Sequence, residues 1–146
     1  MKISTKGRYG LRILIDLALH DGDSPRLIRD IARSQEISEK YISRLMVPLR
    51  RAGLIRSIRG ARGGFRLAKG LEEITLLDVV EVMEGPVSIV DCVSTPEGCS
   101  RASCCRSREI WTDLNAEIRD SMRKIRLLDI LCSDPSFHPL NSSSDQ

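Results

Sequence analysis

A group of cysteines is the strongest candidate for chemistry in this sequence. Four of the five cysteines lie within 14 residues, at Cys92, Cys99, Cys104 and Cys105. Thiolates on one short segment can hold an iron–sulfur cluster, bind zinc or act as a thiol switch, and the spacing leaves these three interpretations open. A structural zinc site would prefer two C-x2-C pairs, whereas the pattern here is C-x6-C-x4-C-C. Inert thiols are the weakest interpretation, because the segment is polar.

Enzymatic catalysis finds little support in the remaining residues. The sequence has two histidines, His20 and His138, and neither lies in a recognisable catalytic motif. A phosphate-binding loop and a nucleophile elbow are also missing from the sequence. A cysteine enzyme needs a base beside its thiolate, and the sequence suggests none. We therefore expect a protein that is not an enzyme.

The charge of the chain is divided unevenly between its two halves. Residues 1–70 carry 16 Lys/Arg and six Asp/Glu, whereas residues 71–146 carry seven Lys/Arg and 14 Asp/Glu. A basic half favours a polyanionic partner over a merely solvated surface. Aromatic residues make up 3% of the chain, too few for a base-stacking platform, so duplex DNA is the better partner. No apolar run approaches the roughly 18 residues of a membrane span, and we expect a cytoplasmic protein without membrane contact.

Hydrophobic periodicity predicts a mainly α fold, a winged helix-turn-helix domain with a two-stranded wing and a long C-terminal dimerisation helix. Thr5 is expected to cap a first helix over about 6–20, and Thr75 a later one that stops at Gly85. The predicted organisation is a DNA-binding domain over 1–85 with its helix-turn-helix at 28–51 and wing at 54–69, a cysteine-bearing loop at 86–105, a dimerisation helix at 106–132 and a polar tail at 133–146.

The second helix of the helix-turn-helix pair is the expected recognition helix, with Ser38 as its cap. At 100° per residue its apolar residues fall on one side and its polar residues on the other. The buried side is predicted to hold Ile42, Leu45, Met46 and Leu49, and the outward side Lys40, Ser43, Arg44, Val47 and Arg51. Residues near the start of such a helix reach base edges best, which assigns base contacts to Ser38, Glu39, Lys40 and Ser43. Arg50 and Arg51, further along, suit phosphates. Pro48 is expected to bend the helix or to mark its early end.

The predicted wing has a glycine-rich tip flanked by arginines, in the segment RSIRGARGGFRL. Glycine lets the backbone turn tightly and approach a surface closely. Arg59 and Arg62 on such a narrow loop suit the minor groove, whose negative potential is strongest in A·T-rich DNA.

The long C-terminal helix is expected to pair with a second copy of the chain. Its apolar positions recur at alternating spacings of three and four, a heptad seam with one polar member, at Trp111, Leu114, Ile118, Ser121, Ile125, Leu128 and Cys132. Packing against the first helix of the same chain is the alternative. A two-fold dimer would present two recognition helices to the half-sites of a palindromic operator.

Taken together, these motifs resemble the IscR/NsrR/RirA-type winged-helix regulators of the Rrf2 family. The likeness covers residues 1 to about 131, and its parts are MKISTKGRYGLRILIDLALH, LIRDIARSQEISEKYISRL, LRRAGLIRSIRGARGGFRL, EITLLDVVEVMEG, the cysteine loop and EIWTDLNAEI. The resemblance implies a homodimeric transcription regulator whose DNA affinity is adjusted by a labile cluster. It implies cluster ligation by Cys92, Cys99 and Cys105, with [2Fe–2S] favoured over [4Fe–4S], and it maps the family's wing arginine onto Arg59.

Three positions depart from the family pattern. Six residues separate the first two ligand cysteines where five are common. Arg108 stands where one branch has a histidine ligand, and Arg8 stands where another has an acidic one. The fourth ligand is therefore open between Cys104, Glu109, a solvent or small thiol, and none. The departures also permit a cluster-free regulator that responds to a metabolite, a partner enzyme or thiol oxidation.

Overall fold

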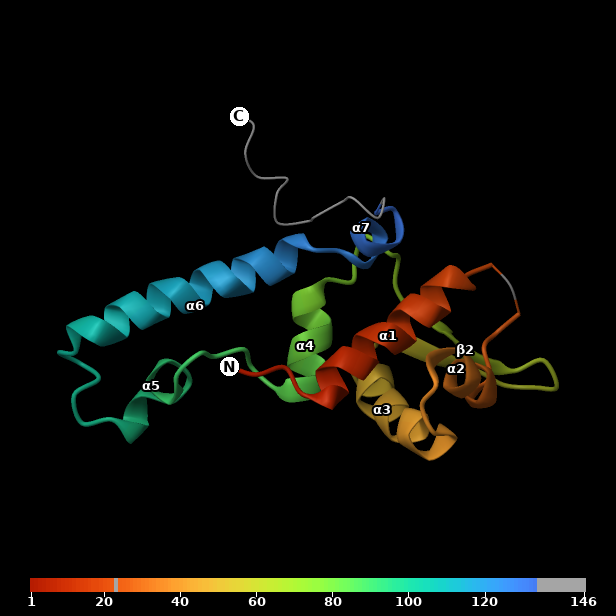
Figure 1. Ribbon diagram of the computed structural model, residues 1–146, viewed down its shortest axis with the longest axis horizontal. Helices are drawn as coiled ribbons and strands as arrows, with labels where there is room; N and C mark the ends of the chain where they lie inside the picture. Colours follow the sequence, from red (N-terminus) through yellow and green to blue (C-terminus); the bar gives the residue numbers. More distant parts are fainter. Residues whose placement is uncertain (23, 134–146) are drawn as a thin grey trace.

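The computed structural model describes residues 1–22 and 24–133, and it has the mainly helical winged helix-turn-helix architecture that the sequence predicts (Figure 1). In chain order the elements are α1 (Thr5–Leu19), α2 (Ile28–Gln35), α3 (Glu39–Arg51), β1 (Ile55–Ile58), β2 (Gly64–Leu67), α4 (Leu76–Glu84), α5 (Asp91–Ser94), the 3-10 helix η1 (Pro96–Gly98), α6 (Arg106–Lys124) and α7 (Leu127–Leu131). The two strands form one antiparallel sheet, in which Ile55 pairs with Leu67 and Ile58 with Gly64. Among the described residues, no helix is both long enough and apolar enough to cross a membrane. The expected tail, apart from Ser133, and His138 lie outside the described residues.

Helix α1 is the centre of the hydrophobic core. Its buried residues include Ile13, Leu14 and Leu17, and α2, α3, α4, α7 and the wing all contact it. The expected cap at Thr5 is wrong by one residue. Ser4 has the extended backbone of a cap, and its hydroxyl accepts a hydrogen bond from the backbone N–H of Lys6.

The helix-turn-helix is formed by α2 and α3. Glu36, with a φ of 55°, turns the chain after α2 in the left-handed region, and Ser38 caps α3 as predicted. Pro48 does not mark an early end of the helix, because α3 continues through Pro48 to Arg51. Leu27 is exposed at the extended cap position before α2.

Helix α4 packs closely against α1 at two glycines. A Cβ on Gly10 would lie 2.7 Å from the Met83 side chain, and one on Gly7 would lie 2.8 Å from the Glu84 carboxylate. The side chain of Glu84 accepts hydrogen bonds from the Ser4 hydroxyl at 2.6 Å and from the backbone N–H of Gly7 at 2.8 Å. Thr75 and Asp78 form the expected capping box at the start of α4.

Two expectations about the C-terminal third need correction. The segment 86–105 is not a continuous loop, because it contains α5 and η1. The helix predicted over 106–132 ends at Lys124, and a short separate helix, α7, follows. Between them the backbone is extended and pairs with the segment before α4: Ile125 accepts from the N–H of Leu76, and the N–H of Leu127 donates to Ile74, each at 2.8 Å. This pairing also buries Leu127 in the core. Because α6 ends at Lys124, Leu128 and Cys132 are not on the same helix as Trp111.

Candidate DNA-binding face and cysteine segment

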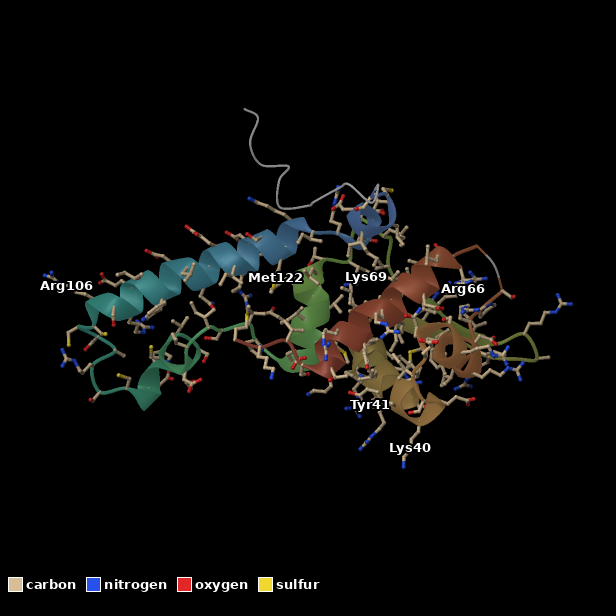
Figure 2. The ribbon with its side chains drawn as sticks, in the orientation of Figure 1. Lys40, Tyr41, Arg66, Lys69, Arg106 and Met122 are labelled. Atoms are coloured by element: carbon tan, nitrogen blue, oxygen red, sulfur yellow. The ribbon has the colours of Figure 1, made fainter. Side chains whose placement is uncertain are left out.

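Helix α3 has one buried face and one exposed face, as the periodicity predicts. The four predicted core residues Ile42, Leu45, Met46 and Leu49 are at most 3% exposed. The opposite face is open, and Figure 2 shows Lys40 pointing away from the body of the protein. The exposed residues are Ser38, Glu39, Lys40, Ser43, Arg44, Val47, Arg50 and Arg51. The hydroxyl of Ser43 donates to the Glu39 carbonyl at 2.9 Å, and that of Ser38 accepts from the N–H of Tyr41 at 3.3 Å.

The start of α3 is held against α1 by an aromatic contact. The rings of Tyr9 and Tyr41 meet edge to face with their centroids 5.9 Å apart, and the Arg12 guanidinium lies 5.1 Å from the Tyr9 centroid. Arg12 also donates to the side chain of Gln35 at 3.1 Å and to its carbonyl, which connects this contact to the end of α2. These contacts fix the direction in which the exposed face of α3 points.

The wing projects from the body as a narrow hairpin (Figure 1). Arg59 and Arg62 are exposed in the turn between β1 and β2, where the sequence predicts them. The turn requires glycine: Gly60 has a φ of 109°, and a Cβ on Gly63 would lie 2.3 Å from the Ile58 carbonyl. The hairpin therefore stays narrow up to its turn, which carries the two arginines.

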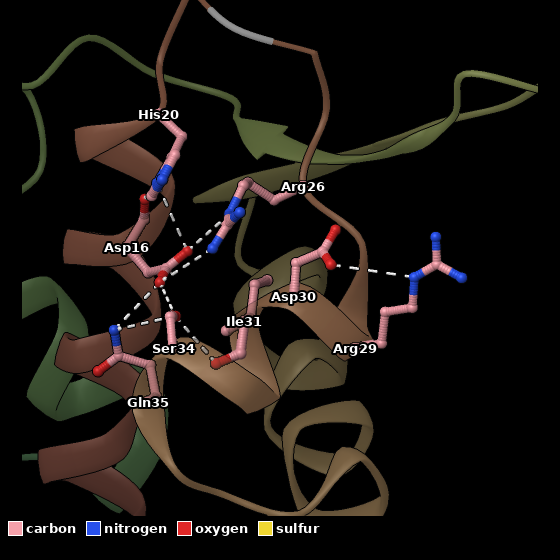
Figure 3. Close-up of polar contacts among 8 residues, drawn as sticks. All are labelled: Asp16, His20, Arg26, Arg29, Asp30, Ile31, Ser34 and Gln35. Carbon is pink, nitrogen blue, oxygen red and sulfur yellow. Dashed lines mark hydrogen bonds and ion pairs between the residues drawn. The ribbon is translucent and has the colours of Figure 1, made fainter.

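The sequence prediction missed a buried carboxylate at the base of the helix-turn-helix. Asp16 of α1 is 2% exposed and accepts hydrogen bonds from Arg26 Nε at 2.9 Å, from Gln35 Nε2 at 3.1 Å and from the hydroxyl of Ser34 (Figure 3). Burial raises the pKa of Asp16, but the hydrogen bonds from these three side chains together hold it below its ordinary value. An acidic residue inside the apolar run ILIDLAL was the available signal that a buried cation lies nearby.

The cysteine segment lies at the end of the molecule remote from the wing (Figure 1). Cys92 belongs to α5, Cys99 follows η1, and Cys105 is the cap residue of α6. These three side chains are partly buried, whereas Cys104 is exposed. Arg108, which stands where a ligand was considered, donates from Nε to the Cys92 carbonyl at 2.9 Å. Cys132 is exposed after α7, apart from the others in the chain.

The environment of Cys105 favours its thiolate. Its Sγ lies 3.2 Å from the hydroxyl of Ser107. This hydrogen bond, followed by that from the backbone N–H of Arg108, lowers the pKa of the Cys105 thiol. Iron and zinc bind thiolates, so the donor chemistry of the segment fits a thiolate-ligated group. Within residues 1–22 and 24–133, however, no three His, Cys, Asp or Glu side chains are gathered closely enough to hold a metal ion. The cysteines therefore supply suitable ligands without forming a preassembled site.

Helix α6 has a group of apolar side chains in each of its two halves. Ile118 and Met122, in its C-terminal half, pack against Leu77, Val80 and Val87, so the contact within the chain is with α4 and not with α1, the alternative considered above. The buried side chain of Asn115 accepts from the N–H of Ile89 and donates to the Val87 carbonyl. Ile110, Trp111 and Leu114 in the N-terminal half are 66%, 41% and 41% exposed. Such a group of large exposed apolar residues is typical of an interface.

Comparison with known proteins agrees with this arrangement. Residues 3–133 match the Rrf2 family model, described as an iron-dependent transcriptional regulator. The HTH-type transcriptional regulator CymR of Bacillus subtilis is 42% identical over 125 residues, which are 86% of this chain and 83% of CymR. Protein rrf2 of Nitratidesulfovibrio vulgaris is 38% identical over 142 residues, which are 97% of this chain and 94% of that protein.

Solved structures show the same likeness in three dimensions. The structure of CymR, the global cysteine regulator of B. subtilis, superposes with a TM-score of 0.76 at 39% identity, and covers 92% of this chain and 99% of its own. The structure of T. potens IscR superposes with a TM-score of 0.73 at 31% identity, and covers 94% of this chain and 93% of its own.

Proposed function

Because the chain belongs to the Rrf2 family of transcriptional regulators, which are not enzymes, we propose that it is a cytoplasmic homodimer that binds a palindromic operator in double-stranded DNA. The observation that carries this proposal is the exposed polar face of α3, directly opposite four buried core residues. A helix held this firmly can enter the major groove as a rigid unit.

Residues at different positions on this surface are suited to the base edges, the phosphates or the minor groove of DNA. The side chains of Ser38, Glu39, Lys40 and Ser43 lie at the start of α3, from which base edges are reached. Arg44 extends the same face, and Arg50 and Arg51 in the last turn suit phosphates. Arg59 and Arg62 are assigned to the minor groove beside each half-site. The DNA-binding part would comprise residues 1–85, and α6 would form the separate dimerisation helix.

In vitro selection from a random duplex library tests this proposal and identifies the operator sequence at the same time. The purified protein should enrich a two-fold symmetric sequence. Lys40→Ala should weaken binding to that sequence at least tenfold, which corresponds to the loss of about 1–3 kcal/mol per good base contact. The exposed Glu97 of η1 is far from α3 in the chain, so Glu97→Ala should bind as the unaltered protein does. Recovery of no enriched sequence would overturn the proposal.

We propose that the group that senses the regulatory signal is an iron–sulfur cluster held by Cys92, Cys99 and Cys105, [2Fe–2S] in preference to [4Fe–4S]. The description of the family as iron-dependent and the likeness to IscR support this assignment, as does the environment that favours the Cys105 thiolate. A bound cluster would supply a group sensitive to redox state, nitric oxide or iron supply. The polypeptide would contribute three thiolates, with Cys104 as the alternative or fourth ligand.

Counting iron and sulfide in protein purified without oxygen tests the cluster directly. We expect a sulfur-to-iron charge-transfer band that is lost when Cys92, Cys99 and Cys105 are all changed to Ala. Cys132→Ala is the matched control and should keep the band, because Cys132 lies beyond α7. Protein that stays colourless and iron-free after anaerobic reconstitution would exclude the cluster.

A cluster-free regulator is the second candidate, and two observations favour it. The three cysteines are not gathered into a metal-holding group in the described part of the chain, and CymR, a global cysteine regulator, is among the similar proteins. Such a regulator would respond to a metabolite, a partner enzyme or thiol oxidation. Regulation that persists in the triple Cys→Ala variant would favour a metabolite or a partner enzyme.

A further inference from the structure

At its base the wing packs in the core through Ile55 and Leu67, and further along β2 it pairs with one residue of the linker before α2. Arg26, between α1 and α2, forms an isolated antiparallel bridge with Phe65 of β2. The N–H of Arg26 donates to the Phe65 carbonyl at 3.0 Å, and the N–H of Phe65 donates to the Arg26 carbonyl at 2.8 Å. Arg26 thus extends the two-stranded sheet by a single residue on the side of β2.

This attachment is close, and Gly64 makes it possible. A Cβ at Gly64 would lie 2.6 Å from the Arg26 carbonyl oxygen, and its φ of 152° falls in the region that favours glycine. A hairpin with two strands of four residues each is marginally stable by itself in water. The bridge to Arg26 therefore helps to set the direction of the wing beyond its base at Ile55 and Leu67.

The side chain of Arg26 is held by the buried carboxylate of Asp16. Its Nε lies 2.9 Å from Asp16 Oδ1 and its Nη2 lies 3.4 Å from Oδ2, and the two side chains are 18% and 2% exposed. Ser34 and Gln35 at the end of α2 donate to the same carboxylate (Figure 3). One buried charge therefore joins α1, α2 and, through Arg26, the wing.

We propose that Asp16 and Arg26 are positioning residues that fix the wing relative to the recognition helix α3, so that Arg59 meets the minor groove while α3 lies in the major groove. This inference rests on the proposed DNA-binding function. Asp16 and Arg26 do not touch DNA in this proposal. They act through the backbone of Phe65 and the hairpin that follows it.

The variant Arg26→Met separates this role from a general loss of stability. The bridge to Phe65 uses backbone atoms and can still form, and Ser34 and Gln35 still donate to Asp16, so the connection between α1 and α2 remains. Ser34→Ala is the matched control, because it removes a donor to the same carboxylate and leaves the wing attachment untouched. Thermal unfolding of each variant checks that it is folded.

Duplex binding is then measured in a double-mutant cycle with Arg59→Ala on the selected operator. If Arg26 acts through the wing, Arg26→Met weakens binding about five- to tenfold alone and less than about twofold in the Arg59→Ala background. Arg26→Met with Lys40→Ala is the comparison cycle and should be additive. An equal loss with and without Arg59 would overturn the proposal, as would no loss at all.

Amide hydrogen exchange in the free protein gives a readout that does not need DNA. We expect the amide of Phe65 to exchange at least about tenfold faster in Arg26→Met, while those of Ile13 and Leu14 in α1 keep their rates. Unchanged exchange at Phe65 would overturn the positioning role. If the unaltered protein binds no duplex, the proposed function fails, and the exchange rates still decide whether Arg26 holds the wing.

Discussion

Individual arginines on the DNA-binding face differ in what they can reach. Arg59 is carried by the thin glycine-rich turn of the wing, whereas Arg51 ends a helix whose opposite side is buried. A side chain inserted in the minor groove senses the width and potential of that groove, and one that neutralises a phosphate does not. Substitutions at these two positions should therefore have different signatures.

For Arg59→Ala we expect weaker operator binding and a reduced preference for A·T pairs beside each half-site. The reason is the loss of a cation from the groove where A·T-rich DNA has its strongest negative potential. Binding to duplexes that differ only in these flanks measures the effect. Equal affinity of the variant and the unaltered protein across all flanks would exclude the minor-groove assignment.

Arg51→Ala should lower the affinity for every duplex by a similar factor. Removal of one phosphate contact per protomer should also flatten the plot of log affinity against log salt by about one unit per contact. A titration series over several salt concentrations provides the measurement. A loss confined to particular base sequences would instead indicate a contact to base edges.

At the scale of secondary-structure elements, the junction of α1 and α4 depends on one carboxylate. Hydrogen bonds from the Ser4 hydroxyl, and then from the backbone of Gly7 and Ser4, outweigh partial burial and lower the pKa of Glu84. The unfolded chain therefore takes up this proton at a higher pH than the folded protein does. The stabilisation is present above the ordinary carboxyl range and is lost as the pH falls through the lowered pKa of the folded state.

Glu84→Gln should accordingly destabilise the protein most at neutral pH. We expect the difference in unfolding free energy between the two proteins to shrink as the pH falls below about 5. Urea unfolding at a series of pH values measures it, with Glu97→Gln in the exposed η1 as control. A difference that stays constant down to about pH 3 would show that the charge of Glu84 does not stabilise this junction.

The elements that could be predicted from the sequence are those with local causes. Ser38 as a cap and the spacing of Ile42, Leu45 and Leu49 predict α3 because capping and periodicity act within a few residues. The end of α6 could not be predicted in this way. The apolar pattern continues beyond Lys124, but backbone pairing with residues far earlier in the chain, at Ile74 and Leu76, ends the helix.

The same limit applies to the candidate sites. The exposed polar face of α3 follows from helical geometry, and its position was predicted. The contact between Asp16 and Arg26 depends on how the α1–α2 linker meets the wing, and this arrangement is not encoded in local spacing. The cysteine spacing predicted candidate ligands, but it did not predict that Cys92 lies in α5 or that η1 precedes Cys99.

At the scale of the whole molecule, the structure is elongated. The helix-turn-helix and wing lie at one end and the cysteine segment at the other, with α4 and α6 between them (Figure 1). The exposed residues Ile110, Trp111 and Leu114 are on α6, beyond its contact with α4. A second copy of the chain that covers them would bring two DNA-binding ends together by a two-fold axis.

Leu114→Asp should therefore convert the proposed dimer to a monomer. A charge placed in an apolar interface is costly to bury, and we expect sedimentation velocity to show half the mass with an unchanged helical content. Binding to the palindrome should weaken by more than about tenfold, because two linked half-site contacts become independent. Ala116→Asp adds the same charge on the opposite side of α6 and should remain dimeric. A Leu114→Asp variant that sediments as the unaltered protein would exclude this interface.

The attachment of α6 to α4 has a mechanical consequence. The ion pair of Arg119 with Glu81 and the packing of Met122 hold the C-terminal half of α6 against α4. Helix α6 can therefore tilt about this contact. The part of α6 between this contact and Arg106 extends about 20 Å, so a tilt of about 10° displaces the far end by about 3 Å. Hydrogen bonds to base edges tolerate only a few tenths of an ångström. In the proposed dimer, a tilt of this size between α6 and α4 would therefore exceed the tolerance of contacts between the two protomers and their half-sites.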